Sequence, residues 1–490
     1  MFRTSNALRA LAALLLLFIA AAPLRAADDL DEGRFELKYG KDFPFTGGRV
    51  DVDHRFGTLT VRTHSEATVE VRATIRSSDP EIGKRIHIVA GSSASGVSIR
   101  TEFPELHNFH GNISYSVDMS VTLPANAPLR AQNRFGNIDA RGLAATSTLG
   151  NSQGSIRVDD SRGPLTLTNS FGAIEATDTH GELAVTNSNG SVTVRTVDGA
   201  LSVSNRFGNI VVSDVQRGAT ITNANGNIEA MDVTGGLKAS TSFGNVRAST
   251  VSGNADVTSV NGRIDLSNVT GSATLRDTFG TAKVDSVRGS LTVNGENASV
   301  DAKTIGGSVR IDTTFGSITV QNAGAATITD ANGNVKASDI NGTFNAENRF
   351  GSVHAERVRG SADVRNANGT VTLQEISGGA KVSTSFASVF LDGIGGAVDV
   401  DNSNGAISVR GLRGGCHPVS LETSFSSIKV AVPGEVGYDL NARTTFGHIT
   451  SAVPVTTNAA REDSLVGTIG RGGCRLDLRS SNGNITIERE

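Results

Sequence analysis

The sequence has few of the residues from which large globular cores are built. Among 490 residues there is no tryptophan, there are three tyrosines, and aromatic residues amount to 5%. Glycine is abundant instead, with 56 residues, and Asn, Ser and Thr recur throughout. A chain of this composition would build a poor globular core, so internal repeats are the first feature to look for.

The chain also lacks an excess of basic residues. It has 45 Lys plus Arg against 49 Asp plus Glu. Without the three arginines of residues 1–26 the balance becomes 42 against 49, a net charge of −7. A protein that binds nucleic acid needs a basic stripe that neutralises phosphates. We therefore expect no nucleic acid partner.

Long apolar runs are missing beyond the N-terminal segment. Arg3 and Arg9 precede an almost wholly apolar run over residues 11–22, which leads into "PLRAADD". This order is typical of a secretory signal peptide over residues 1–26, with cleavage after Ala26. The run is too short for a comfortable membrane span. We expect an exported protein of the periplasm or the cell surface, or a secreted one, with no membrane-spanning segment after cleavage.

One short sequence word, as in "SNRFGNIVV" (204–212), returns at a fixed interval. Phe recurs every 36 residues with a single step of 35, and Gln153 and a series of Asn lie halfway between. The unit is therefore about 18 residues, with Phe and Asn alternating at one position, which we call the corner position. The corner residues are Phe135, Phe171, Phe207, Phe243, Phe279, Phe315, Phe350 and Phe386, and Asn189, Asn225, Asn261, Asn297, Asn332, Asn368 and Asn404.

Each unit predicts two strands of four to five residues. In "GALSVSNRFGNIVVSDVQRG" (199–218), Leu201, Val203, Ile210 and Val212 alternate with mostly polar residues. This period of two indicates strands with one buried face, and glycine permits the tight turns between them. A single unit cannot bury its apolar face, but stacked units bury a continuous core. The predicted fold is an all-β parallel β-solenoid of about 16 short coils.

Two interpretations of the corner position remain open. In the first, a large ring packs beside a small amide, as an inheritance from a duplicated 36-residue unit. Counting outward from Leu201 and Val203 places Phe207 on the inward side, which favours packing. In the second, an exposed aromatic stripe contacts sugar rings. Small polar residues such as Asn169 and Asn205, two before the corner, are expected to form ladders that satisfy backbone groups of the turn.

The ends of the chain depart from the regular repeat. We expect an irregular N-terminal β cap over residues 27–130, regular coils over 131–411, and C-terminal coils with a cap over 412–490. In the N-terminal cap, Ser78 and Asp79 before Pro80 predict the start of a short helix. In the C-terminal cap, Cys416 and Cys474 predict a disulfide, because cysteine pairs of exported proteins form disulfides in an oxidising environment. The alternative is two separate cysteines that fill turns.

The stretch "YSVDMSVTLPANAPLRAQNRFGNIDARGL", the repeated coils and the ending "LVGTIGRGGCRLDLRSSNGNITIERE" resemble the bacterial "putative adhesin" domain family. The resemblance covers roughly residues 35–490. It implies a right-handed, single-stranded β-helix (β-solenoid) in the bacterial envelope. It brings no catalytic motif, and some relatives are linked to envelope-stress systems rather than to adhesion.

Candidates for chemistry are weak, so we expect no catalytic, cofactor-binding or metal site. A polysaccharide lyase or hydrolase on a β-helix needs clustered charged groups beside long loops, and the coils carry no inserted loop. A metal site needs three or four convergent ligands. We interpret the following as surface or turn residues: His107 and His110 near Glu105; Asp51, Asp53 and His54; and "GTIGRGG" at 467–473.

Two classes of function remain from the sequence. The first is a non-catalytic, adhesin-like rod that recognises an envelope glycan or protein. The second is a structural or regulatory envelope-stress protein of the periplasm, with a partner bound at the N-terminal cap. An enzyme that acts on polysaccharide ranks below both. No cofactor is expected in any of them.

Overall fold

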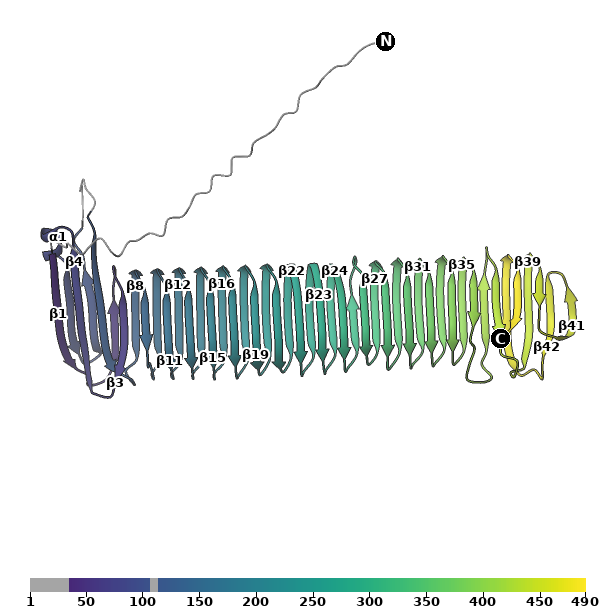
Figure 1. Ribbon diagram of the computed structural model, residues 1–490, viewed down its shortest axis with the longest axis horizontal. Coiled ribbons are helices and arrows are strands. Elements are labelled where there is room, and N and C mark those ends of the chain that lie inside the picture. Colours follow the sequence, from purple (N-terminus) through teal and green to yellow (C-terminus); the bar gives the residue numbers. More distant parts are fainter. Residues whose placement is uncertain (1–34, 106–112) are drawn as a thin grey trace, which may run out of the picture.

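The computed structural model describes residues 35–105 and 113–490. These form a long, straight parallel β-solenoid of about 17 turns, with coils near 18 residues (Figure 1). The predicted solenoid fold is thereby confirmed. The signal peptide predicted for residues 1–26, and His107 and His110, lie outside the described residues. Within the described ranges no helix has the length and apolar character needed to cross a membrane.

Two strands and two turns make up a regular coil, as in β16 (Leu201–Phe207) and β17 (Ile210–Val215). Each strand pairs in parallel with the equivalent strand 18 residues away. The strands hold seven and six residues rather than the four to five expected, because ladder pairing continues through the corners. In each of β22, β23 and β24 one continuous strand covers both sides of the coil.

The coils from residue 129 to 410 stack in chain order along the rod. Their strands are β8 (Leu129–Phe135), β9 (Ile138–Arg141), β10 (Ser147–Gln153), β11 (Ile156–Ser161), β12 (Leu165–Phe171), β13 (Ile174–Thr179), β14 (Leu183–Asn189), β15 (Val192–Val197), β16, β17, β18 (Ala219–Asn225), β19 (Ile228–Thr234), β20 (Leu237–Phe243), β21 (Val246–Ser252), β22 (Ala255–Val269), β23 (Ala273–Val287), β24 (Leu291–Ile305), β25 (Val309–Asp312), β26 (Ile318–Ala323), β27 (Ala326–Asn332), β28 (Val335–Ile340), β29 (Phe344–Phe350), β30 (Val353–Val358), β31 (Ala362–Asn368), β32 (Val371–Ile376), β33 (Ala380–Phe386), β34 (Val389–Ile394), β35 (Val398–Asn404) and β36 (Ile407–Arg410).

Inside the coils, Val, Ile, Leu and Ala side chains form one continuous core. Its edge carries a ladder of buried polar residues two positions before the corner, as predicted. Asn205 donates from Nδ2 to the carbonyl oxygens of Gly190 and Gly208, at 3.1 and 3.2 Å. The same bond to the carbonyl 15 residues earlier is made by Asn151, Asn169, Asn187, Asn223, Asn348, Asn366 and Asn402. The ladder thus satisfies backbone carbonyls that the turns leave unpaired.

A second ladder, which the period-two pattern does not predict, lies near the end of the second strand. One residue per coil adopts a left-handed backbone there, for example Asp214 at φ 58°. Pairing skips this residue, so Val212 and Val215 both point inward although they are three apart. The series is Asp160, Asp178, Thr196, Asp214, Asp232, Thr250, Asn268, Ser286, Thr304, Asn322, Asp339, Arg357 and Glu375. Asp and Asn tolerate this conformation, whereas it strains the β-branched Thr.

At the N-terminal end the coils do not follow chain order. The coil of β8 and β9 stacks on a coil made of β2 (Arg49–Asp53) and β3 (Leu59–His64). About 65 residues of chain separate the end of β3 from the start of β8. The next coil is built from β6 (Gly96–Glu102) and β7 (Tyr115–Pro124). Antiparallel strands then cover the exposed sheet edge, which protects it from pairing with other chains. These are β1 (Phe35–Pro44), β4 (Thr68–Ser77) and β5 (His87–Ser93).

The N-terminal cap also contains α1 (Pro80–Lys84), the one α-helix of the described residues. Asp79 caps it by accepting hydrogen bonds from the backbone N–H groups of Glu81 and Ile82. The helix start that the sequence predicts at this site is confirmed.

The C-terminal end is interleaved in a similar way. The last coil of the chain, β43 (Cys474–Asn482) with β44 (Ile485–Arg489), inserts between two coils that precede it in sequence. One of these holds β37 (Val419–Thr423) and β38 (Ile428–Val432), and the other β39 (Tyr438–Phe446) and β40 (Ile449–Ser451). An antiparallel hairpin of β41 (Val455–Arg461) and β42 (Ser464–Ile469) covers the end.

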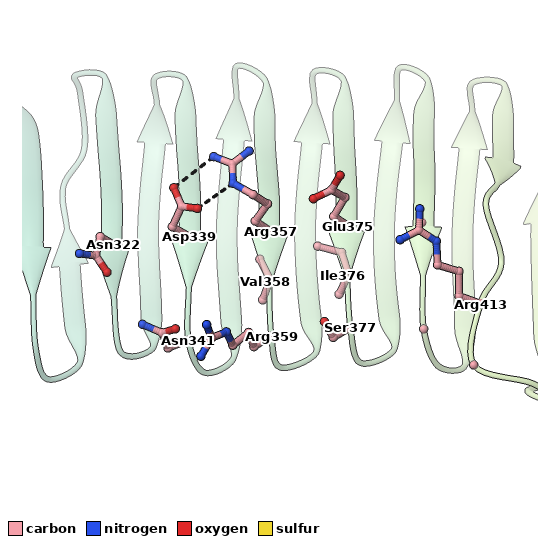
Figure 2. A pocket seen from close by; sticks show the side chains of 13 residues that line it. Asn322, Asp339, Asn341, Arg357, Val358, Arg359, Glu375, Ile376, Ser377 and Arg413 are labelled. Atoms are coloured by element: carbon pink, nitrogen blue, oxygen red, sulfur yellow. Dashed lines mark hydrogen bonds and ion pairs between the residues drawn. The ribbon is translucent and has the colours of Figure 1, made fainter.

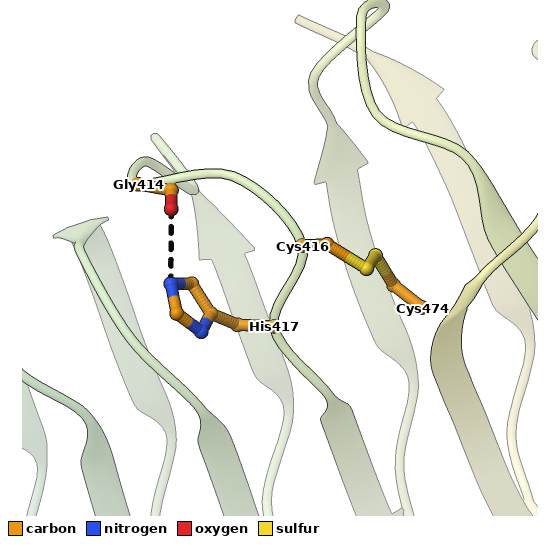
Figure 3. Close-up of a disulfide and its surroundings, with 4 residues drawn as sticks. All are labelled: Gly414, Cys416, His417 and Cys474. Carbon is orange, nitrogen blue, oxygen red and sulfur yellow. Dashed lines mark hydrogen bonds between the residues drawn. A yellow bond between two sulfur atoms is a disulfide. The ribbon is translucent and has the colours of Figure 1, made fainter.

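A disulfide joins Cys416 to Cys474, with the Cα atoms 5.4 Å apart (Figure 3). Cys416 lies in the loop before β37, and Cys474 begins the inserted strand β43. In the same loop the ring of His417 contacts the carbonyl oxygen of Gly414 through Nε2 at 3.0 Å. The bridge therefore ties the inserted last coil to the coil on which it stacks, and it is the pairing that the sequence predicts.

Candidate functional surface: the corner row

The corner phenylalanines are exposed, which corrects the prediction that they point inward. Their exposed fractions lie between 39% for Phe135 and 58% for Phe243. The row contains Phe135, Phe171, Phe207, Phe243, Phe279, Phe315, Phe350 and Phe386. The alternating Asn and Gln153 are partly or fully exposed beside them. Packing of the rings into the core is therefore not the reason for the alternation.

The outward position of the rings has a local cause at the buried Asn two residues before them. Asn187 pairs with Asn205, and Asn189 pairs with Phe207, but the residue between them is skipped on both strands. The chain bends there, so Arg206 and Phe207 both face outward after the inward Asn205. A strict count of every second residue fails at such an irregularity. Gly208 follows at φ 121°, where an added Cβ would lie 2.3 Å from the carbonyl oxygen of Gly190.

The row continues across the C-terminal cap in space, although not in sequence. Phe425 is 64% exposed and Phe446 is 73% exposed. Asn482 lies between them: it pairs in register with Phe446, and its Nδ2 donates to the carbonyl oxygen of Ser424 at 3.3 Å. The order Phe386, Asn404, Phe425, Asn482, Phe446 thus keeps the alternation through a coil inserted from elsewhere in the chain. The sequence intervals alone hide this continuity.

At the N-terminal end the row closes in an aromatic cluster. The rings of Phe135 and Phe56 stack at 4.9 Å between centroids with 4° between planes. Phe56 also makes edge contacts with Phe103 and Tyr115 at 4.9 and 5.2 Å. Rings in adjacent coils can therefore stack without disturbing the ladder.

Polar grooves run beside the row. One groove of about 350 Å³ is lined by residues just before Phe350, Asn368 and Phe386, including Arg349, Arg365 and Ser385. A second, of about 410 Å³, is lined by Arg443, Thr445, Arg479 and Ser481, just before Phe446 and Asn482. Elsewhere on the row, the Arg206 guanidinium lies 5.4 Å from the centroid of the Phe207 ring. Rings, amides and hydrogen-bonding groups thus share one edge of the rod.

A hollow of about 640 Å³ lies at the other corner, along the left-handed ladder (Figure 2). Its floor is crossed by the Asp339–Arg357 pair, in which Nε donates to Oδ1 at 2.7 Å and Nη2 to Oδ2 at 3.1 Å. These bonds hold the pKa of the Asp339 carboxyl below its usual range and raise the pKa of Arg357. Asp339 and Arg357 are thus paired with each other between coils, and the corner row, which continues from Phe135 to Phe446, is the better candidate for ligand contact.

Other candidates from the sequence are not drawn together by the fold. Asp51 and Asp53 stay solvated, and Asp51 pairs with Arg49 at 3.0 Å. His54, expected to be solvated, is buried, because it takes the inward place that Asn133 holds in the next coil. Burial lowers the pKa of His54 to about 4. In "GTIGRGG", residues 470–473 form a turn, while 467–469 belong to β42.

One group missed from the sequence is His64, Glu66 and Glu70, whose ligand atoms lie within 4.8 Å of one another. These residues join β3 to β4 near the N-terminal cap. The Nε2 atom of His64 is already 2.8 Å from the carbonyl oxygen of Thr68, and Glu66 is exposed. The spacing over a strand end and a turn gives no metal motif, so only the fold reveals the group.

Two carboxyl groups occupy the inner polar ladder where other coils have Asn. Asp277 is 2% exposed, and its carboxyl oxygens have no hydrogen-bond partner. Burial raises its pKa to about 6. Burial also raises the pKa of Asp330, although Thr313 and the backbone N–H of Asn332 donate to it. Both groups lie behind the corner row, and Asp330 contributes to the lining of the 350 Å³ groove beside it.

Comparison with known proteins identifies a family that part of the chain resembles. Residues 322–488 match the Toastrack DUF4097 family. A crystal structure of a "putative cell adhesion protein" from Clostridium sporogenes ATCC 15579 aligns over 93% of this chain and 100% of that one, at 9% identity and a TM-score of 0.19. No curated protein sequence matches. Over residues 322–488, the Toastrack match confirms the resemblance to an adhesin-like β-solenoid family that the sequence motifs indicated.

Proposed function

We propose that this protein is a non-catalytic, exported rod of the cell envelope that works by surface recognition of a glycan or a protein. The observation that carries the proposal is the row of exposed corner rings, at every second coil from Phe135 to Phe446. Exposed aromatic rings lose contact with water when a ligand covers them, so a row of them favours binding. The signal peptide predicted for residues 1–26 supports export.

Protease digestion of intact cells tests the location. We expect the mature protein to be shaved away while a periplasmic control protein survives. Survival until the outer membrane is opened would contradict surface recognition and favour the periplasmic structural or regulatory role. The protein is followed by immunoblot with an antibody against the C-terminal cap.

Incubation of the purified protein with envelope polysaccharides tests the absence of catalysis. We expect no new reducing ends and no unsaturated products above a buffer blank. Turnover that scales with protein concentration would contradict a purely binding role. The Asp339→Asn variant is measured beside the wild type, because Asp339 lines the hollow at the second corner, where several charged groups lie. Turnover that this variant loses would come from the hollow.

A further inference from the structure

We propose that the corner row binds a linear β-1,4-linked glycan lengthwise, with one sugar ring per coil. This inference rests on the surface-recognition function proposed above and names its ligand class. The row is straight, because every coil stacks in parallel register on the next (Figure 1). It is narrow, because the chain bends at the buried Asn two residues before each ring and turns at the glycine after it.

The narrow shape favours a thin polymer over a protein surface. A stable protein interface covers about 800 Å² on each partner and has a well-packed centre. A ridge of single rings at the edge of a coil offers a line of contacts instead. A polymer chain that lies along the line can touch every ring at once, and the weak contacts then add up along one molecule.

The period of the row selects among linear polymers. Equivalent rings repeat every two coils, about 9.6 Å at the usual strand spacing. An extended peptide repeats one face about every 6.8 Å, which falls out of step with the rings. A nucleic acid strand needs a basic groove, whereas the chain carries net negative charge. In an extended β-1,4-linked glycan each sugar advances by close to one strand spacing and is flipped relative to its neighbour, so the same face returns every two coils.

The alternation of side chains matches the alternation of sugar faces. An apolar C–H face suits a Phe ring, and the hydroxyl-bearing flank of the next sugar suits an Asn amide, which donates and accepts hydrogen bonds. The groove beside the row adds hydroxyl and guanidinium groups, for example Ser385 and Arg349. The order Phe425, Asn482, Phe446 keeps this alternation where the 36-residue repeat has ended. Inheritance from a duplicated unit does not account for that.

Binding of defined hexasaccharides to the full mature protein tests the inference. The probes are chitohexaose, cellohexaose and peptide-free peptidoglycan strands, with β-1,3-linked laminarihexaose as the linkage control. A hexasaccharide spans about six coils and therefore about three rings. We expect at least one β-1,4-linked probe to bind roughly tenfold more tightly than laminarihexaose, a difference measurable by calorimetry. Equal affinity for both linkages, or binding to neither, would overturn the inference.

A matched variant tests the period while the number of rings stays constant. It moves every second ring by one coil, so that rings stand in stacked pairs; the Phe56–Phe135 stack shows that the ladder accommodates such pairs. The changes are Phe207→Asn, Asn189→Phe, Phe279→Asn, Asn261→Phe, Phe350→Asn, Asn332→Phe, Phe425→Asn and Asn404→Phe. We expect roughly tenfold weaker binding of the β-1,4-linked probe, with an unchanged circular dichroism spectrum. Unchanged affinity would show that ring spacing is irrelevant and would overturn the inference.

A single variant outside the row controls for non-specific binding to exposed aromatic rings. Phe390 is 47% exposed and lies between Thr372 and Ser408 on the face of the second strands. Phe390→Thr is expected to bind like the wild type.

If the protein is shaved from intact cells but binds no hexasaccharide, the glycan inference fails and surface recognition stands. If hexasaccharides bind but the protein resists shaving, the location proposed above fails instead.

Discussion

Phe446 and Asn482 are direct neighbours in the ladder, although a hairpin and a turn separate them in the chain. Asn482 in turn contacts the coil of Phe425 through Ser424. The insertion of the last coil therefore places an amide between two exposed rings. The alternation of rings and amides is a property of the assembled rod and extends beyond the 36-residue sequence repeat.

Removing a corner ring should leave stability almost unchanged, whereas removing the Asn behind it should not. Phe207 is 43% exposed, so Phe207→Asn is expected to change the free energy of unfolding by about 0.5 kcal/mol or less. Asn205→Ala removes two buried hydrogen bonds, from Nδ2 to the carbonyl oxygens of Gly190 and Gly208, and should cost about 1–3 kcal/mol. Urea denaturation compares the two variants. A larger loss for Phe207→Asn than for Asn205→Ala would contradict the exposed position of the ring.

Asp277 should make the rod less stable as pH rises. Its pKa is raised to about 6 in the fold from a reference value of 3.8, so the stability present below pH 3.8 is lost as pH increases through 6. Between these two pH values, Asp277 lowers the free energy of unfolding by about 3 kcal/mol. Asp277→Asn removes the titration and provides a donor toward Gly262, the carbonyl that the ladder pattern assigns to it. We expect the variant to be more stable at pH 8, with a gap that narrows toward pH 3.5 in denaturation curves. A gap that is independent of pH would contradict the buried carboxyl.

Glycine should relieve strain in the left-handed ladder. Thr196 adopts φ 57°, which a β-branched residue resists. Thr196→Gly is expected to raise stability by about 1 kcal/mol, because the relief of strain exceeds the entropy that glycine adds to the unfolded chain. Thr193→Gly in the extended part of the same strand is the matched control and should destabilise. Thermal unfolding measures both, and a loss of stability in both would refute the strain.

The disulfide should stabilise the interleaved C-terminal cap. It closes a loop of 58 residues, for which chain entropy predicts about 4 kcal/mol. Cys416→Ser combined with Cys474→Ser should therefore increase hydrogen exchange in β43 and β44, with little change in the coils near β16, because solenoid coils depend mainly on their neighbours. Uniform exchange changes along the rod would argue against a local role.

Much of the rod follows from the sequence alone. Alternation of apolar and polar residues around Leu201 and Val203 determines the strands, and the 18-residue interval determines the stacking, because identical short units can bury their faces only against one another. The buried polar ladder was also predictable from Asn205 and its equivalents, since turn carbonyls inside a stack need donors. The pairing of Cys416 with Cys474 was predictable from their number and from the export that residues 1–26 predict.

Irregular backbone and contacts between residues distant in sequence become visible only in the folded protein. The outward position of Phe207 depends on a bend at Asn205, and a side-chain count with a period of two cannot detect a skipped residue. The left-handed backbone at Asp214 causes a second residue of the coil to be skipped in the strand pairing. The order of coils at both ends depends on which strand edges remain open for pairing, which no local pattern records. Local periodicity therefore determined the coil, and non-local strand pairing decided the caps and the continuous row of rings from Phe135 to Phe446.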